Sequence, residues 1–244
     1  MQNCLKLFDD SKENLDFLKG NIENTFKDPS ISYAVHAIKS RIKDRRHLEE
    51  KIERKIAEGK KIDEETFFNE ITDLVGIRIL MLYPQYFIDI HKFIKNKINL
   101  KEWELKEEPI LYTWDEDVRR FFEEHLSFKH VEFKKTLYTS VHYVIRKING
   151  LEKSNYCEIQ VRTLFEEAFG EIDHDVNYPH LTTDETLQAQ LKALSKMMSA
   201  ASKQAESIFL LSKSREEKTS SENKLERRKE PSFWIKIKNI FSWY

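Results

Sequence analysis

The chain changes from helical to strand-like hydrophobic spacing and back, and these changes divide it into three parts. Apolar residues recur at helical spacing in residues 10–28 and then over the longer stretch 31–60. Four isoleucines of the longer stretch repeat in heptad-like steps and are expected to face a core, namely Ile38, Ile42, Ile52 and Ile56. The first part of the chain is therefore predicted to be helical.

The centre of the chain is predicted to contain a sheet. Residues 75–83 form an almost continuous apolar run, VGIRILMLY, which is typical of a buried strand. Alternating residues predict two more strands at 140–146 and 156–162, and a turn near Asn149 and Gly150 gives this pair the spacing of a hairpin. These three segments are the predicted middle of the fold.

The remaining segments complete the fold class. Helical spacing returns at residues 84–99, 115–126, 163–178 and 183–211, while residues 102–113 alternate weakly and predict another strand. The order of these elements predicts an α/β (α+β) fold, in which helices flank a central mixed β-sheet and extend it at both ends.

The C-terminal region has a different composition. Residues 212–232 are rich in Lys, Glu and Ser and lack apolar periodicity, which predicts a flexible charged linker. Residues 233–244 would place an apolar stripe on one side of a helix. Docking on the domain's own surface is the favoured role of this amphipathic segment. Contact with a subunit or antitoxin, or with a membrane surface, are the alternatives. The predicted divisions are 1–30, 31–211, 212–232 and 233–244.

Composition narrows the class of protein. The chain has 244 residues, of which 34% are charged, and its formal net charge is −1, so it is no generic binder of polyanions. Charge is uneven, however, because residues 39–61 hold ten Lys or Arg against five Asp or Glu. Cys4 and Cys157 form no metal-binding motif. No secretory leader or spanning segment is recognisable, which predicts a cytoplasmic location.

Polar residues interrupt the apolar segments at three places. Asp73 stands at the start of the 75–83 strand, and Arg78 lies within it, where a buried charge requires a partner. Glu158, Gln160 and Arg162 alternate with apolar residues and so share one strand face. Taken singly, Asp73 is better explained as a turn or cap residue, and the polar strand face as a solvated one.

Two further groups complete the candidate chemistry. A loop carries Tyr138 shortly before His142, which are packing residues in most proteins. If 31–60 is one helix, one side of it presents four basic side chains, Lys43, His47, Lys51 and Arg54. Phosphoryl transfer from ATP needs a carboxylate-bound Mg²⁺, cations, a base and a stacking surface, and these groups include all of them. No glycine-rich phosphate loop is present in the sequence.

Four segments in succession resemble the motifs of the RelA/SpoT synthetase domain. They read DLVGIRI, YTSVHY, EIQVRT and HDVNYPH, and the resemblance extends over roughly residues 30 to 180. The length leaves no room for the hydrolase and regulatory domains of the long members, so the chain resembles a stand-alone small alarmone synthetase or a toxin relative. The resemblance implies a pyrophosphokinase that uses Mg²⁺ and transfers pyrophosphate from ATP to the 3′-hydroxyl of GDP or GTP.

The resemblance also implies roles for single residues. Asp73 matches the magnesium-binding aspartate, and Glu158 matches the catalytic glutamate that binds metal or activates the acceptor hydroxyl. The implied ATP-binding residues are Arg41 and Arg78 around the adenine and Lys43, Lys51 and Arg54 along the phosphates. The implied acceptor-binding residues are Lys134, Tyr138, His142, Gln160 and Arg162, with Tyr138 stacked on the base. Supporting roles fall to His174 and Tyr178.

The acceptor loop departs from the family pattern. The family's G-Y-R-S-x-H is replaced by Leu137-Tyr138-Thr139-Ser140-Val141-His142, which lacks the glycine and the arginine. ATP as donor is therefore better supported than a guanosine nucleotide as acceptor. A toxin relative that modifies adenine nucleotides or the tRNA 3′ end is the alternative, and an inactive nucleotide-binding module is a third reading that the retained carboxylates disfavour. Homo-oligomers and an antitoxin partner are compatible with either enzyme.

Overall fold

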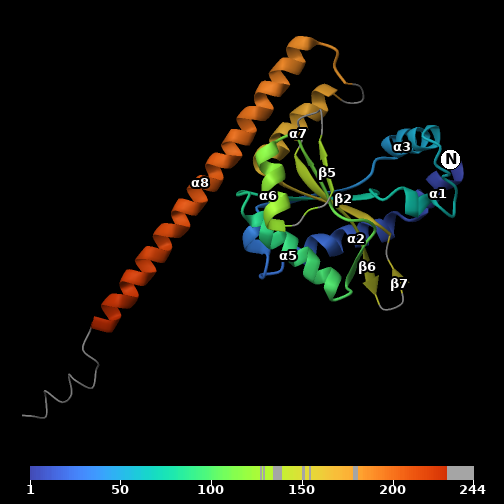
Figure 1. The fold of residues 1–244 in the computed structure, drawn as a ribbon. Coiled ribbons are helices and arrows are strands. Elements are labelled where there is room, and N and C mark those ends of the chain that lie inside the picture. The colour runs from blue at the N-terminus through green and yellow to red at the C-terminus, as the bar shows by residue number, and fades with distance from the viewer. Residues whose placement is uncertain are drawn as a thin grey trace, which may run out of the picture. The chain divides into compact units, whose positions relative to one another are not determined.

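The structure is a computed structural model that describes residues 1–126, 128, 130–133, 139–149, 152–153, 155–177 and 181–229. Met1–Lys203 form one compact unit and Gln204–Tyr244 form a second. The sheet, its core and the candidate site all lie in the first unit (Figure 1). Lys134, Tyr138, Tyr178 and the whole 233–244 segment fall outside the described residues.

A mixed sheet organises the first unit. In the described part of the chain its strands follow the order β1-β2-β8-β6-β4-β5, and the short strands β3 and β7 both pair with β6. Pairing is parallel for β2 with β8 and for β4 with β5, and antiparallel for the other pairs. The strands are β1 (Ala37–Ile42), β2 (Val75–Met81), β3 (Trp103–Leu105), β4 (Ile110–Thr113), β5 (His130–Phe133), β6 (Ser140–Asn149), β7 (Glu152–Lys153) and β8 (Cys157–Thr163).

Helices occupy the segments between and around the strands. They are α1 (Gln2–Asp10), α2 (Lys12–Thr25), α3 (Arg45–Ala57), α4 (Phe67–Glu70), α5 (Tyr86–Asn99), α6 (Glu116–Leu126), α7 (Leu164–Asn177) and α8 (Glu185–Lys229), with a 3₁₀ turn η1 (Ser32–Ala34). The predicted α/β class with a central mixed sheet is confirmed.

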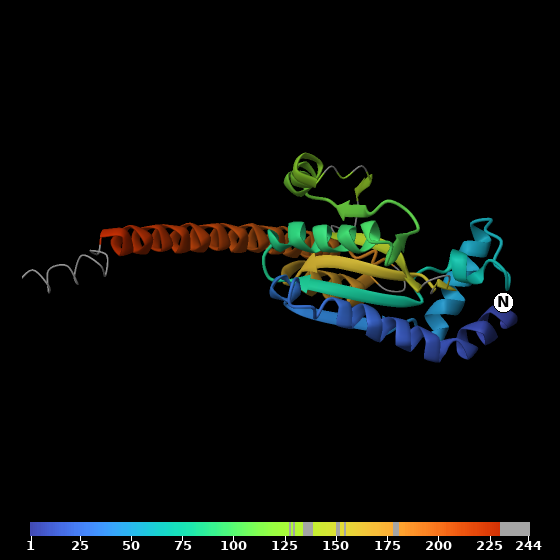
Figure 2. The same cartoon turned by 90° about the horizontal axis from the view of Figure 1, so that it is seen from below.

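One face of the sheet is apolar and carries the core. On β2 and β8 this face presents Ile77, Ile79, Ile159 and Val161, all at most 1% exposed. Buried leucines and isoleucines of α2 and α5 belong to the same cluster. Both helices lie along the strands in Figure 2. Because side chains alternate along a strand, burial of this face turns the polar residues of β2 and β8 to the opposite face.

A reciprocal pair of hydrogen bonds fixes the start of α7 directly after β8. The Glu166 Oε2 atom accepts from the Thr163 backbone nitrogen at 2.6 Å, and the Glu166 nitrogen donates to Thr163 Oγ1 at 3.3 Å. This is the capping box that a Thr followed three residues later by Glu favours. The strand thus leads straight into a helix whose position relative to the sheet is set locally.

The prediction of one helix over residues 31–60 is wrong. The stretch contains β1, whose alternating residues pair antiparallel with β2, and α3 begins only after Asp44. The Asp44 side chain accepts hydrogen bonds from the Arg46 and His47 nitrogens, which is a helix N-cap. Lys43 therefore precedes the helix, and the predicted helical row of four cations does not exist.

Other boundaries also differ from the predicted ones. The helix expected over 10–28 corresponds to α2, and α1 before it had no predicted counterpart. The strand expected over 102–113 is two short strands. Strand β5 had no predicted counterpart. By contrast, the 140–146 and 156–162 segments pair antiparallel as β6 and β8, as the hairpin spacing predicted.

The segment expected to be a flexible linker is helical as far as Lys229, so that expectation is wrong for residues 212–229. Lys, Glu and Arg have high intrinsic helix propensity, which can maintain a helix that has no apolar stripe. Lys213 Nζ and Glu216 Oε2 lie 3.1 Å apart, one turn from each other on α8. The division of the chain into domains remains a prediction.

Two isoleucines of α3 test the core assignment. Both were expected in the core, but Ile52 is fully buried whereas Ile56 is 46% exposed. We expect Ile52→Ala to lower the free energy of unfolding by about 2–5 kcal/mol, and the matched Ile56→Ala to lower it by less than about 1 kcal/mol. Urea denaturation of the two variants measures the difference. Equal losses would contradict the burial of Ile52.

Candidate functional site

The polar face of the sheet brings distant sequence segments into register. Gly76 of β2 pairs with Glu158 of β8, and Arg78 pairs with Gln160. On the other side of β8, His142 of β6 pairs with Gln160. On the other side of β2, Arg41 of β1 pairs with Gly76. The three motifs recognised in the sequence therefore lie side by side on adjacent central strands, as members of one site would have to.

Asp73 forms the first half of the site together with two lysines. Its Oδ2 atom lies 2.8 Å from Lys43 Nζ and 2.7 Å from Lys51 Nζ. Lys43 is held there because its backbone nitrogen donates to the Leu74 carbonyl at 2.8 Å. Lys51 reaches the same oxygen from the second turn of α3. The segment after β1, the start of β2 and α3 thus converge on one carboxylate.

The carboxyl group of Asp73 loses its proton at a pH well below neutral. Burial is the largest influence and would raise its pKa, but the charges of Lys51 and Lys43 and their hydrogen bonds outweigh burial and lower the pKa to about 2. Its other oxygen, Oδ1, is buried and accepts no hydrogen bond from any described residue. One oxygen of Asp73 is therefore engaged, and the other is left for a cation.

Glu158 forms the second half of the site. His142 Nδ1 lies 3.1 Å from Glu158 Oε1, and Gln160 Nε2 donates to Glu158 Oε2 at 2.8 Å. Burial would raise the pKa of Glu158, and nearby Asp73 adds to this. The hydrogen bond and charge of His142 and the amide of Gln160 prevail and hold that pKa below its ordinary value. Asp73 and Glu158 line the same cavity.

A cavity of about 310 Å³ lies over this face of the sheet. Its lining combines both carboxylates with cations and an imidazole: Lys39, Ser40, Arg41, Asp73, Gly76, Ile77, Arg78, Glu158, Gln160, Glu171 and His174. Arg41 and Arg78 enter it from adjacent strands at diagonal register positions. Two guanidinium groups in this relation suit a planar aromatic ligand such as a nucleobase.

Magnesium fits the residues present. Mg²⁺ is commonly bound by one or two carboxylates together with phosphate oxygens of a substrate, rather than by a full protein cage. Asp73 and Glu158 supply the two carboxylates, and Asp73 Oδ1 lacks a protein donor among the described residues. Among the residues that the structure describes, no group of three or more His, Cys, Asp or Glu could hold a metal ion. The arrangement therefore suits a metal that arrives with a polyphosphate.

A buried glutamate connects the polar face to α7. Glu167 is 4% exposed and contacts three cations from three strands. Its carboxylate lies 2.5 Å from Arg162 Nη2, 2.8 Å from Lys39 Nζ and 3.2 Å from Arg78 Nη1. Arg78 also pairs with Glu171, one turn further along α7. Burial would raise the pKa of Glu167, but Lys39, Arg162 and Arg78 lower it.

The structure brings together most, though not all, of the residues predicted for the site. Lys51, Lys43 and Asp73 meet, as do Glu158, His142 and Gln160, and His174 of α7 lines the cavity. Arg162 is only 3% exposed and points to Glu167. Arg54 does not line the cavity, and its side chain is 68% exposed beside Glu58. The roles of all these residues stay predictions.

Besides Glu167, three residues of this region were not anticipated from the sequence. Lys39 and Glu171 line the cavity, and Tyr112 of β4 packs edge-on against His142 with ring centroids 4.6 Å apart. Lys39 stands two residues before Arg41 on β1, so recognising that segment as a strand would have placed both on one face. No local pattern marks Tyr112, because β4 and β6 are far apart in sequence.

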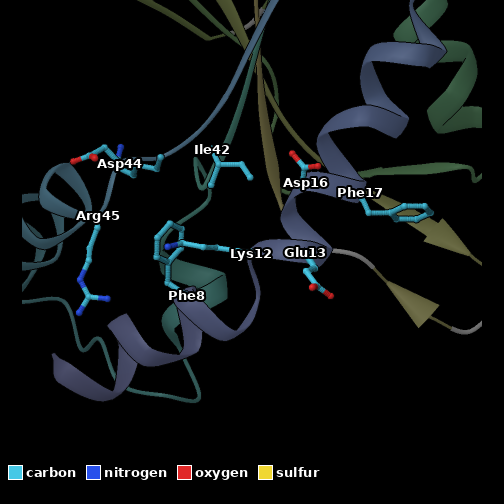
Figure 3. A pocket seen from close by; sticks show the side chains of 9 residues that line it. Phe8, Lys12, Glu13, Asp16, Phe17, Ile42, Asp44 and Arg45 are labelled. Carbon is cyan, nitrogen blue, oxygen red and sulfur yellow. The ribbon is translucent and has the colours of Figure 1, made fainter.

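A second, more open hollow of about 710 Å³ lies beside the α1–α2 turn and the start of α3. Figure 3 shows Lys12 close to Phe8, with the carboxylates of Glu13 and Asp16 on the α2 side and Asp44 and Arg45 on the α3 side. Its lining includes no residue of β2 or β8, whose polar side chains line the smaller cavity. Lys43 also lines the open hollow, while the Nζ atom of that lysine contacts Asp73. The smaller cavity is therefore the candidate site.

Comparisons with known proteins agree with this fold. A solved structure of a GTP pyrophosphokinase family protein from Streptococcus pneumoniae superposes with a TM-score of 0.60 at 16% identity, covering 83% of this chain and 91% of that one.

Small alarmone synthetase 1 from Bacillus subtilis has a similar structure, with a TM-score of 0.61 at 19% identity over 86% of this chain and 97% of that one. A structure of the same synthetase bound to its product pppGpp gives a TM-score of 0.57 at 18% identity, over 85% and 97% of the two chains. At these identities the likeness shows the fold alone. No curated protein matches the chain in sequence.

In the described residues, no helix has the length and apolar character needed to cross a membrane.

The family model described as "Region found in RelA / SpoT proteins" matches residues 40–183, which is more than half of the chain and includes every motif of the candidate site. The chain therefore belongs to the RelA/SpoT family.

Proposed function

We propose that the chain is a pyrophosphokinase that transfers the β,γ-pyrophosphate of ATP to the 3′-hydroxyl of GDP or GTP and makes ppGpp or pppGpp. The observation that carries the proposal is that two carboxylates, Asp73 and Glu158, line one cavity. Asp73 with Lys43 and Lys51 lies beside Glu158 with His142 in a chain of the RelA/SpoT family. The structural relatives include one structure of a small alarmone synthetase bound to AMPCPP and another of the same synthetase bound to its product pppGpp. These ligands support nucleotides as both donor and acceptor.

The donor side of the site would bind ATP through charge and stacking. Arg41 and Arg78 are placed to enclose the adenine, and Lys43 and Lys51 to contact phosphate oxygens. Asp73 and Glu158 would hold Mg²⁺, which neutralises charge on the phosphates. In the reaction the acceptor oxygen attacks the β-phosphorus, the bond from that phosphorus to the α-phosphate oxygen breaks, and AMP leaves.

The acceptor side centres on Glu158. Its lowered pKa makes it a weak base, so we assign it chiefly to orienting the acceptor hydroxyl and holding the metal. The proton of the hydroxyl passes to the Glu158–His142 pair, whose atoms lie 3.1 Å apart. Tyr138 is proposed to stack on the acceptor base, and Lys134 and Gln160 to contact the acceptor.

A toxin-type enzyme that modifies the tRNA 3′ end or adenine nucleotides is the second candidate. The observation that favours it is the acceptor loop, in which the family's glycine and arginine are replaced by Leu137 and Thr139. The donor chemistry is the same in both candidates, so only the acceptor distinguishes them.

Substitution of the two carboxylates tests the chemistry. We expect Asp73→Asn and Glu158→Gln each to reduce kcat by about 10²–10⁴-fold, because each removes a charge that acts on the reacting groups. The matched control is Glu53→Gln, which changes an exposed carboxylate of α3 and should leave the rate unchanged. Transfer from labelled ATP is the measurement, with circular dichroism to verify folding. Full activity of both site variants would refute the assignment.

Identification of the product tests the acceptor. Purified protein is incubated with Mg²⁺ and ATP labelled in the γ-phosphate, with GDP, GTP, ADP or tRNA in separate reactions. We expect label in the guanosine nucleotides. Label confined to tRNA or to adenine nucleotides would contradict the first candidate and support the second, while absence of label from every acceptor would contradict both.

A further inference from the structure

Glu167 holds the side chains of two cavity residues without lining the cavity itself. Lys39 and Arg78 both line the cavity, and both contact Glu167 Oε1, at 2.8 and 3.2 Å. They lie opposite each other in the β1–β2 register. One carboxylate oxygen on α7 therefore fixes the ends of two long side chains that come from neighbouring strands.

The three cations around Glu167 differ in burial. The Arg162 side chain is 2% exposed, whereas those of Arg78 and Lys39 are 28% and 54% exposed. A buried charge needs a close partner more than an exposed charge does. Glu167 thus chiefly balances Arg162, and the more exposed cations retain positive charge that can act on an anionic ligand.

We propose that Glu167 is a positioning residue of the nucleotide site, which holds Lys39 and Arg78 where they contact bound ATP. This inference rests on the proposed function, because ATP is its ligand. Lys39 is in consequence a further ATP-binding residue, supplied by a strand position outside the recognised motifs. Restricting two flexible side chains before the ligand arrives reduces the entropy lost on binding.

The first test compares ATP binding with turnover. We expect Glu167→Gln to raise the Kd of AMPCPP, measured by calorimetry, roughly tenfold, while kcat at saturating ATP stays within about threefold of wild type. A purely structural role would lower the active fraction and leave the Kd unchanged. Tighter binding by Glu167→Gln would show that the carboxylate competes with the ligand, and would overturn the proposal.

The neighbouring carboxylate supplies a matched control. Glu166→Gln alters the cap of α7 and leaves the Glu167 carboxylate in place, so we expect reduced thermal stability and an unchanged Kd. If Glu166→Gln weakens binding as much as Glu167→Gln does, the effect belongs to the helix and the proposal fails.

A double-mutant cycle tests whether Glu167 acts through Lys39. Lys39→Met should also raise the Kd of AMPCPP several-fold. The double variant should raise this Kd by less than the product of the two separate fold-increases. Independent effects would overturn the proposal. Lys39 is exposed, so this variant tests the inference even if Glu167→Gln does not fold; wild-type affinity of Lys39→Met would then overturn it. A wild-type chain that transfers pyrophosphate while both variants bind normally would refute this inference but leave the proposed function standing.

Discussion

The parallel pairing of β2 with β8 is the constraint on which the site depends. It places Gly76 opposite Glu158 and Arg78 opposite Gln160, while the intervening Ile77 and Ile159 turn to the core. A shift of the register by one residue would exchange the two faces and bury the charged side chains. The same alternation therefore specifies both the apolar core and the polar site. A change in the register of β2 against β8 would disrupt both of them.

Two carboxylates of the site region have several cationic partners each. Asp73 has Lys43 and Lys51, and Glu167 has three cations. Both carboxylates have lowered pKa values despite burial, so both keep their charge at neutral pH. The cations outnumber the carboxylates in each cluster, which leaves the surface suited to a polyanionic nucleotide even though the whole chain is nearly neutral.

The strands and carboxylates of the site were predicted better from the sequence than the segments and contacts around the site. The apolar run around Arg78 and the alternation around Gln160 identified β2 and β8, because buried strands have a strong local signal. The error in residues 31–60 arose because β1 is short and its isoleucines also fit helical spacing. Contacts such as Arg162 with Glu167 or Tyr112 with His142 depend on tertiary structure, which no local pattern encodes.

The two oxygens of Asp73 show how the donor site can be prepared before its ligands bind. Both lysines contact Oδ2, and Oδ1 has no hydrogen-bond donor among the described residues. A cation can therefore be accepted without breaking either ion pair. Two positive lysines beside one carboxylate nevertheless oppose a free divalent cation, and the phosphates of ATP remove that opposition. On the proposed function, binding of metal and of ATP at Asp73 should consequently be cooperative, since each supplies the charge that the other requires.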